Sequence, residues 1–453
     1  MITRRNMLLG TAAMTALPAF GNATQRDVLR ASTIRQRIAP EPYAETDLWS
    51  FGGSFPGRTL RYKQGERLSL DLVNELPAAT SVHWHGIRID NAMDGVPGLT
   101  QPAIPAGDTF TYDFALPDAG TYWYHSHLQT VEQMERGLYG ALIVEEADAP
   151  DVDHDLVLVL DDIRFTDQAQ VDPDFDSFFD RSHGGRIGNV ALVNGKIDES
   201  FDVKRGDRLR LRLISAANSR IFELGLQGMT AHVVAYDGMP LIAPQPVTET
   251  FALAPSQRID LIVDITDDSD AYLIQYERDG GYAAVHFNVS GGSDTTRPAP
   301  NALPPNPDYP IDLANAETLP LLIEGGAMAG LSHAMYKGTR MTGRELAQEN
   351  MFWALNGQVG RTETPLIEVS KGQTVRIGMA NDTAFPHAMH LHGMHFAQVL
   401  ADGTLGPLRD TILIESQGQI EIAFNAHNPG DWLFHCHMLS HHAAGMGSFI
   451  RVI

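Results

Sequence analysis

The sequence is poor in cysteine, in positive charge and in long apolar runs. A single cysteine, Cys436, excludes an internal disulfide. The 56 Asp and Glu outnumber the 33 Lys and Arg, giving a formal net charge of -23, so the chain would repel a nucleic acid. Beyond the N-terminus no stretch reaches the roughly 20 apolar residues of a membrane span, so we do not expect an integral membrane protein. What remains is a large acidic chain of 453 residues, long enough for several separate cores.

Residues 1–23 have the composition of an export signal. Arg4 and Arg5 precede an apolar run from Met7 to Phe20, and small residues follow up to Ala23. The paired arginines match a twin-arginine signal, which predicts export to the periplasm by the twin-arginine (Tat) machinery. A membrane anchor is the alternative, but the apolar run is too short to span a bilayer comfortably.

Short alternating patterns broken by Gly, Pro, Asn-Gly and Asp-Gly run along the whole chain, and no long stretch keeps a helical period. The fold class is therefore predicted to be all-β. One turn-then-strand unit occurs three times, which predicts three sandwich domains. The three copies are Lys63 to Leu70, Lys204 to Leu211 and Ser370 to Ile377.

Composition shifts suggest where the domains meet. An acidic, proline-containing stretch lies around Glu145 to Asp155, and a Gly/Ser/Pro-rich linker runs from Ser290 to Pro310. We therefore expect domains at 24–148, 149–300 and 301–453. The middle copy has Gly225 and Gln227 where the third has His390 and His392, so it would space and orient the outer two domains.

Four histidine clusters lie in the outer domains and use ten of the 18 histidines. A lone His-X-His pair on a strand is commonly accidental, but residues two apart share a face, and four such clusters around the only cysteine predict metal binding. The clusters are His83 and His85; His125 and His127; His387, His390 and His392; and His435, Cys436, His437 and His441.

Ligand type and strand alternation divide these residues between two kinds of site. Two His, one Cys and a weak Met form a trigonal blue-copper set, which His387, Cys436, His441 and Met446 supply. Cys436 should face away from the histidines on either side of it, so one peptide would touch two copper sites. His387 should likewise face away from His390 and His392. The alternatives are a buried apolar thiol for Cys436 and a packing role for Met446.

These motifs resemble the four signature motifs of the multicopper oxidases, and the resemblance covers essentially the mature chain. It implies three cupredoxin-like Greek-key β-sandwich domains, with a type 1 copper in the third and a trinuclear cluster between the first and third. It also implies that the type 1 copper takes His387, Cys436, His441 and an axial Met446. The type 2 copper would take His83 and His390; the two type 3 coppers would take His85, His125 and His437, and His127, His392 and His435.

The resemblance also implies the reaction. Reducing substrates would give single electrons to the type 1 copper, Cys436 would relay them, and O2 would be reduced to water. Asp94 resembles the acidic residue that delivers protons near the type 2 copper, although an ordinary Asp-Gly turn at Asp94 and Gly95 is the alternative. His442 stands where some bacterial cuprous oxidases have an acidic proton relay, and we expect a solvated surface histidine there rather than a shuttle. Asp410 is expected near the type 1 histidines, where it could accept a hydrogen bond from a phenol.

Two substrate classes fit an oxidase of this kind: phenols and aromatic amines, or Cu(I). Soft thioethers bind Cu(I), but the methionines of the relevant stretch are sparse, and packing is the commoner role for such residues. They are Met328, Met335, Met341 and Met351.

Two other functions are considered. A copper-free cupredoxin-fold scaffold would not need the complete ligand set. A copper nitrite reductase normally carries its type 1 cysteine in an earlier domain and lacks the paired histidines of a trinuclear cluster.

Overall fold

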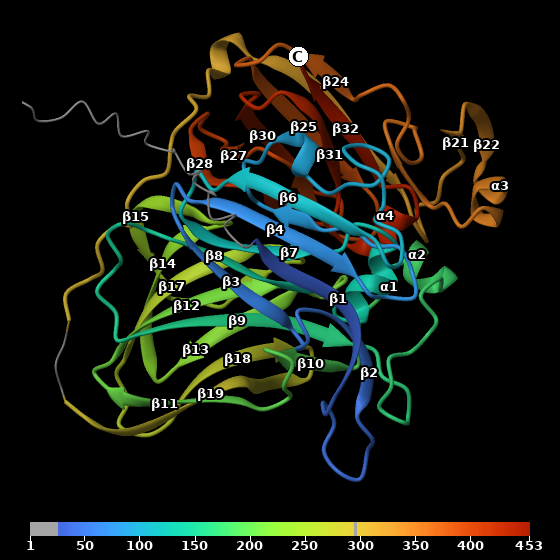
Figure 1. The fold of residues 1–453 in the computed structure, drawn as a ribbon. Helices are drawn as coiled ribbons and strands as arrows, with labels where there is room; N and C mark the ends of the chain where they lie inside the picture. Colours follow the sequence, from blue (N-terminus) through green and yellow to red (C-terminus); the bar gives the residue numbers. More distant parts are fainter. Residues whose placement is uncertain (1–25, 294–296) are drawn as a thin grey trace, which may run out of the picture.

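The computed structural model describes residues 26–293 and 297–453 (Figure 1), so the export signal predicted at 1–23 lies outside the described residues. The predicted all-β class is confirmed: the α-helices among the described residues have five or six residues each. In the part of the chain that the structure describes, no helix has both the length and the apolar character needed to cross a membrane.

The first sandwich pairs the sheet β2-β1-β4-β6 with the sheet β3-β8-β7-β5. Its elements are β1 (Asp27–Gln36), β2 (Thr46–Phe51), β3 (Gly57–Lys63), β4 (Arg67–Asn74), β5 (His83–His85), the 3-10 turn η1 (Asn91–Met93), β6 (Thr109–Ala115), β7 (Gly120–His125), α1 (Thr130–Glu135) and β8 (Tyr139–Glu145).

The second sandwich pairs the sheet β10-β9-β12-β17-β14-β15 with the sheet β11-β19-β18-β13-β16. Its elements are β9 (His154–Ile163), α2 (Phe178–Ser182), β10 (Val190–Val193), β11 (Glu199–Arg205), β12 (Arg208–Ser215), β13 (Phe222–Gln227), β14 (Met229–Tyr236), β15 (Met239–Pro246), β16 (Phe251–Leu253), β17 (Arg258–Ile265), β18 (Ala271–Glu277) and β19 (Gly280–Gly292).

The third sandwich pairs the sheet β23-β20-β25-β30-β27-β28 with the sheet β24-β32-β31-β26-β29, and a hairpin of β21 and β22 stands beside it. Its elements are η2 (Leu313–Asn315), β20 (Glu317–Gly325), β21 (His333–Tyr336), β22 (Thr339–Thr342), α3 (Gly343–Gln348), β23 (Trp353–Leu355), β24 (Ile367–Val369), β25 (Thr374–Asp382), β26 (His387–Leu391), β27 (Phe396–Val399), β28 (Leu405–Arg409), β29 (Thr411–Ile414), β30 (Gln419–Asn425), β31 (Gly430–Cys436), α4 (Leu439–Ala443) and β32 (Gly447–Val452).

The repeated unit found in the sequence occupies the same place in each sandwich. It forms the turn into β4, β12 and β25, and each of these strands pairs in parallel with the first strand of its sandwich. Gly65, Gly206 and Gly372 hold that turn at φ of 85°, 87° and 86°, a backbone conformation that favours glycine. The repeat found in the sequence is therefore also a repeat of the structure.

The cores explain how the three units meet. One cluster of buried apolar side chains runs without a break through the first and third sandwiches, and a second fills the middle one. The short helices α1, α2 and α4, one from each sandwich, gather on one side of the molecule, where α4 contacts both others (Figure 1). The outer sandwiches thus share an interface in which residues of both can line one site.

Candidate metal centre

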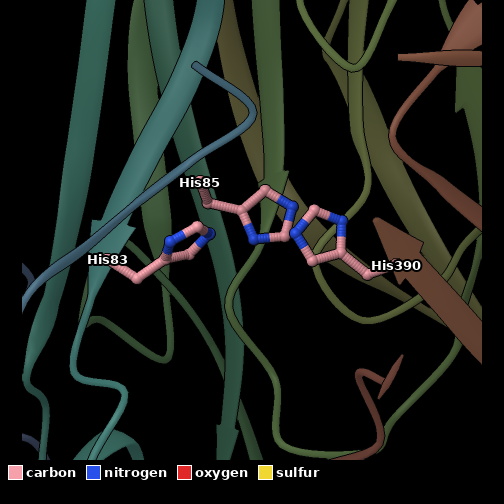
Figure 2. Close-up of side chains that lie close together, drawn as sticks. All are labelled: His83, His85 and His390. Atoms are coloured by element: carbon pink, nitrogen blue, oxygen red, sulfur yellow. The ribbon is translucent and has the colours of Figure 1, made fainter. Parts of the chain in front are cut away.

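Eight histidines from the first and third sandwiches form one buried cluster. Strand register pairs His83 with His125 in the first sandwich and His390 with His435 in the third. Across the interface the rings of His85 and His390 stack at 3.8 Å between centroids. Figure 2 shows His83 and His85, from β5, turned toward His390, from β26. The histidines of the two outer domains thus meet at the interface between them, as predicted.

The ligand atoms of the cluster form three all-histidine triads, each within 4.8 Å, of which two share His85. The triads are His83, His85 and His390; His85, His125 and His437; and His127, His392 and His435. The second and third are the two type 3 sets that the family resemblance implies. The first contains the implied type 2 pair, with His85 shared between it and its neighbour.

Hydrogen bonds hold many of these imidazoles with one nitrogen free. The Nδ1 atoms of His83, His125 and His390 donate to the carbonyl oxygens of Asp94, Ser126 and Asp410 at 2.7, 2.9 and 2.9 Å. Among the described residues, the Nε2 atoms of these three rings have no hydrogen-bond partner. With the proton on Nδ1, the free Nε2 can present a lone pair to a metal. The buried, orphaned nitrogens therefore fit metal ions.

Burial also favours the neutral form of the rings. It lowers the pKa well below the ordinary value, and the neighbouring imidazoles lower it further, in His125, His127, His392, His435 and His437. His85 is held in the opposite sense to His83, because its Nε2 donates to Asp410 Oδ1 at 3.1 Å. Within the described chain its Nδ1 is the atom without a partner.

Cys436 lies in a separate, mononuclear group. Its Sγ is 3.7 Å from His387 Nδ1 and 3.8 Å from His441 Nδ1, and these two nitrogens are 3.1 Å apart. Burial raises the pKa of the Cys436 thiol to about 12, so a metal ion would have to displace its proton. Met446 is buried beside it, and the Met446 carbonyl accepts a hydrogen bond from the Cys436 amide at 3.1 Å. As predicted, His387 faces away from His390 and toward the cysteine.

Each ring of the mononuclear group has an outer hydrogen bond. His387 Nε2 donates to Thr383 Oγ1 at 2.9 Å, and His441 Nε2 donates to the His183 carbonyl at 2.6 Å. His183 belongs to the second sandwich, just after α2, so the middle unit reaches the edge of this site. Sequence reasoning missed it, because nothing local to His183 distinguishes it from a surface histidine.

Asp94 lies between two histidines of the cluster. Its side chain is fully buried and accepts from His392 Nδ1 at 3.0 Å, while its backbone carbonyl accepts from His83 Nδ1. The cramped backbone accounts for the glycine that follows, because a Cβ on Gly95, at φ of 86°, would come within 1.8 Å of the Val82 carbonyl oxygen.

Two expected positions were wrong. Asp410 is not near the type 1 histidines; it is buried against His85 and His390, since the break between β28 and β29 falls beside the larger cluster. It therefore cannot receive a phenol. His442 is not freely solvated on the surface either: α4 leaves it half-buried, with its ring centroid 4.3 Å from that of His435.

A pocket of about 630 Å³ leads from the surface to the histidine cluster. His127 and His442 lie in its wall, and Glu132, Asp174 and Asp176 line it as well. The pocket therefore touches one edge of the cluster, at His127, on the side of α1 and α2.

The four methionines do not form a group of one kind. Met341 and Met351 pack against the small apolar core beneath the β21–β22 hairpin. Met328 and Met335 are 90% and 38% exposed. The packing role expected for the four methionines thus fits Met341 and Met351 and does not fit Met328 and Met335.

Comparison with known families matches the three sandwiches one by one. Residues 33–149, 153–294 and 334–452 each fit a family model described as multicopper oxidase. The chain belongs to the multicopper oxidase family. This finding confirms the resemblance and, with the sheets above, the cupredoxin-like sandwich fold.

Relatives of this multicopper oxidase extend over nearly its whole length. It is 29% identical to the multicopper oxidase MmcO of Mycobacterium tuberculosis over 98% of this chain and 92% of that protein. Lac15 from a marine microbial metagenome is 41% identical, with a TM-score of 0.76 over 93% of this chain and 99% of that one. A multi-copper oxidase from Pseudomonas thermotolerans is 29% identical, with a TM-score of 0.82 over 94% and 98%.

The enzyme is therefore a copper-dependent oxidase that uses O2 as its electron acceptor and phenolic compounds or Cu(I) as donors. Its cofactors are four copper ions: one type 1, one type 2 and two type 3. Family membership favours this activity over the copper-free scaffold and the nitrite reductase.

Proposed function

We propose that each copper is held by the residues that the sequence motifs assign to it. His387, Cys436 and His441, with Met446 as a weak axial ligand, hold type 1, and His83 and His390 hold type 2. His85, His125 and His437 hold one type 3 ion, and His127, His392 and His435 hold the other. The observation that carries this assignment is the convergence of unpartnered imidazole nitrogens, within the described residues, on a common centre.

When bound, the type 1 copper supplies one-electron oxidation, and the other three supply the four-electron reduction of O2 to water. The chain contributes a covalent link, because Cys436 contacts the type 1 histidines while its neighbours His435 and His437 face the cluster. Asp94 holds His392 by hydrogen bond at Nδ1, and we propose that its carboxylate also passes protons toward the cluster. Burial shields the type 1 residues from bulk water, whereas the surface pocket reaches His127 of the cluster.

For the reducing substrate we propose small phenols and aromatic amines rather than Cu(I). Phe178 and Phe179 of α2 are 57% and 64% exposed, which is unusual for such large apolar side chains. The Phe179 ring stacks on His183 at 4.0 Å between centroids, and the His183 carbonyl is bonded to His441. An aromatic donor on this surface would lie one residue away from a type 1 ligand. The exposed Met328 also lies near this segment, because the amide of its neighbour Ala327 donates to the Ser182 carbonyl, but it offers one thioether and no aromatic surface.

Oxygen uptake tests this choice. The copper-loaded mature protein would be compared with dimethoxyphenol and with Cu(I) at matched concentrations, together with a variant carrying Phe178→Ala and Phe179→Ala. We expect the phenol to be preferred and its KM to rise about tenfold in the variant, corresponding to about 1.4 kcal/mol of lost contact. Tyr43→Ala, which removes an exposed ring from the β1–β2 loop, is the control. Preference for Cu(I), with KM for the phenol unchanged in the variant, would refute the proposal.

We also propose periplasmic export by the twin-arginine route and domains at 24–148, 149–300 and 301–453. The arginine pair Arg4 and Arg5 supports the first. For the second, the proposed limits fall between β8 and β9 and between β19 and β20. Replacing both arginines by lysine should retain the protein in the cytoplasm on cell fractionation; unchanged periplasmic activity would exclude this export route.

A further inference from the structure

The second sandwich holds none of the proposed ligands among the residues that the structure describes, yet it sends a buried arginine to the copper cluster. Arg258, the first residue of β17, is fully buried and forms a two-pronged ion pair with Asp410, at 2.9 Å (Nη1 to Oδ1) and 2.5 Å (Nη2 to Oδ2). Its Nε also donates to the Thr121 carbonyl of β7 at 3.3 Å. One guanidinium therefore touches residues of the first and third sandwiches from the second.

Asp410 carries this contact to two proposed copper ligands. Its carboxylate accepts from His85 Nε2 at 3.1 Å, and its carbonyl accepts from His390 Nδ1 at 2.9 Å. These two bonds orient both rings and decide which nitrogen of each faces the metal. Any shift of Asp410 would turn a type 2 ligand and a type 3 ligand together.

A second residue of the middle sandwich fixes the backbone of Asp410. Asp237, in the turn between β14 and β15, is buried, and its Oδ2 accepts from the amides of Asp410 and Thr411 at 3.1 and 3.2 Å. Its Oδ1 accepts from the Arg258 amide at 2.8 Å. The two residues thus hold Asp410 by both its main chain and its side chain.

The first sandwich leaves room for this pair. A Cβ on Gly86, directly after His85, would lie 2.2 Å from Arg258 Nη2 and 2.7 Å from Asp410 Oδ2. Gly86 also has a φ of 86°. The glycine of the His83-to-Gly86 motif therefore allows the Arg258–Asp410 pair to approach His85.

We propose that Arg258 and Asp237 are positioning residues for the type 2 copper and one type 3 copper, acting through Asp410. The proposal rests on the ligand assignment given above. It gives the middle sandwich a direct role in copper binding. Asp237, in the turn after β14, and Arg258, the first residue of β17, set the ligand geometry of a site in which they supply no ligand.

The test compares Arg258→Lys with Arg210→Lys. Arg210 lies on β12, beside β17, and is equally buried and paired with Glu146 and Asp260, without contact to the copper cluster. Copper content, blue absorption and the type 2 electron paramagnetic resonance signal would be recorded for both loaded variants. We expect Arg258→Lys to bind the cluster coppers about 10-fold more weakly and to alter the type 2 signal, with blue absorption retained. Arg210→Lys should leave all three unchanged.

Asp237→Asn is the second variant, because it keeps the shape while placing an amide where a carboxylate accepts hydrogen bonds. It should alter the type 2 signal in the same direction, whether or not Arg258→Lys folds. If both cluster variants give the wild-type signal and copper content, or if Arg210→Lys changes them equally, the positioning role is wrong. If the wild-type protein itself lacks type 2 and type 3 copper, the ligand assignment fails instead.

Discussion

At the residue scale, the alternation of side chains along a strand decides which metal site each ligand faces. Ligand type and strand alternation predict that Cys436 faces one site and that His435 and His437 face another, and the contacts of Cys436 with His387 and His441 agree with that prediction. Positions outside strands were harder to predict. Asp410 lies at a strand break and His442 on a one-turn helix, so local periodicity did not show which way they point.

Asp94→Asn tests the proposed proton supply. The amide keeps the size of the carboxyl, so the fold and the blue absorption should remain. Reoxidation of the reduced enzyme by O2 should slow by about 100-fold or more, the scale of a lost general acid. Stopped-flow spectroscopy measures reoxidation separately from anaerobic reduction of the type 1 copper, which should keep its wild-type rate. Equal slowing of both half-reactions would contradict a proton role.

At the element scale, the repeated turn explains why three weakly similar segments build three sandwiches. Gly65, Gly206 and Gly372 each donate their amide to a strand-end carbonyl, those of Leu116, Ile265 and Ala426. The sequence predicted this repeat and the all-β class, because glycine turns and alternation are local signals. It did not predict the gathering of α1, α2 and α4, since that depends on contacts between sandwiches.

Comparing Gly372→Ala with Gly378→Ala tests whether the turn requires a glycine. Gly378, in the strand that follows the turn, is the control. Within the described chain neither added Cβ would meet an atom within 4 Å, but only Gly372 has a positive φ. Gly372→Ala should therefore destabilise the protein by about 1–2 kcal/mol, whereas Gly378→Ala in β25 should be neutral or stabilising by up to about 1 kcal/mol. Urea unfolding of both variants measures the difference. Equal stability would show that the left-handed turn is not required.

At the scale of the whole molecule, burying so many imidazoles makes the copper-free fold sensitive to acid. Burial lowers the pKa of twelve histidines and raises that of four carboxyls. The histidines therefore decide how the stability of the copper-free fold changes with pH. The histidines are His85, His125, His127, His387, His390, His392, His395, His427, His435, His437, His441 and His442. The carboxyls are Glu135, Asp161, Asp162 and Asp237.

The sign of the pH effect follows from these directions. Below pH 6.5 the histidines bind protons in the unfolded chain but stay unprotonated in the folded chain. The free energy of unfolding that is present above that pH is therefore lost as pH falls. Each histidine contributes up to about 1.4 kcal/mol per pH unit. The Tm of the chelator-treated protein should therefore be lower at pH 5.5 than at pH 7.5 in differential scanning calorimetry. An equal or higher Tm at pH 5.5 would contradict the burial of neutral imidazoles.

The most direct test of the central claim is a spectrum of the copper-loaded protein beside that of its Cys436→Ser variant. The wild type should bind four coppers per chain and absorb intensely in the visible, through the Cys436–copper bond. The variant should lose that absorption and the oxidase activity while keeping its circular dichroism and its type 2 signal. An unchanged visible spectrum in Cys436→Ser would show that Cys436 does not hold the type 1 copper and would overturn the assignment of both sites.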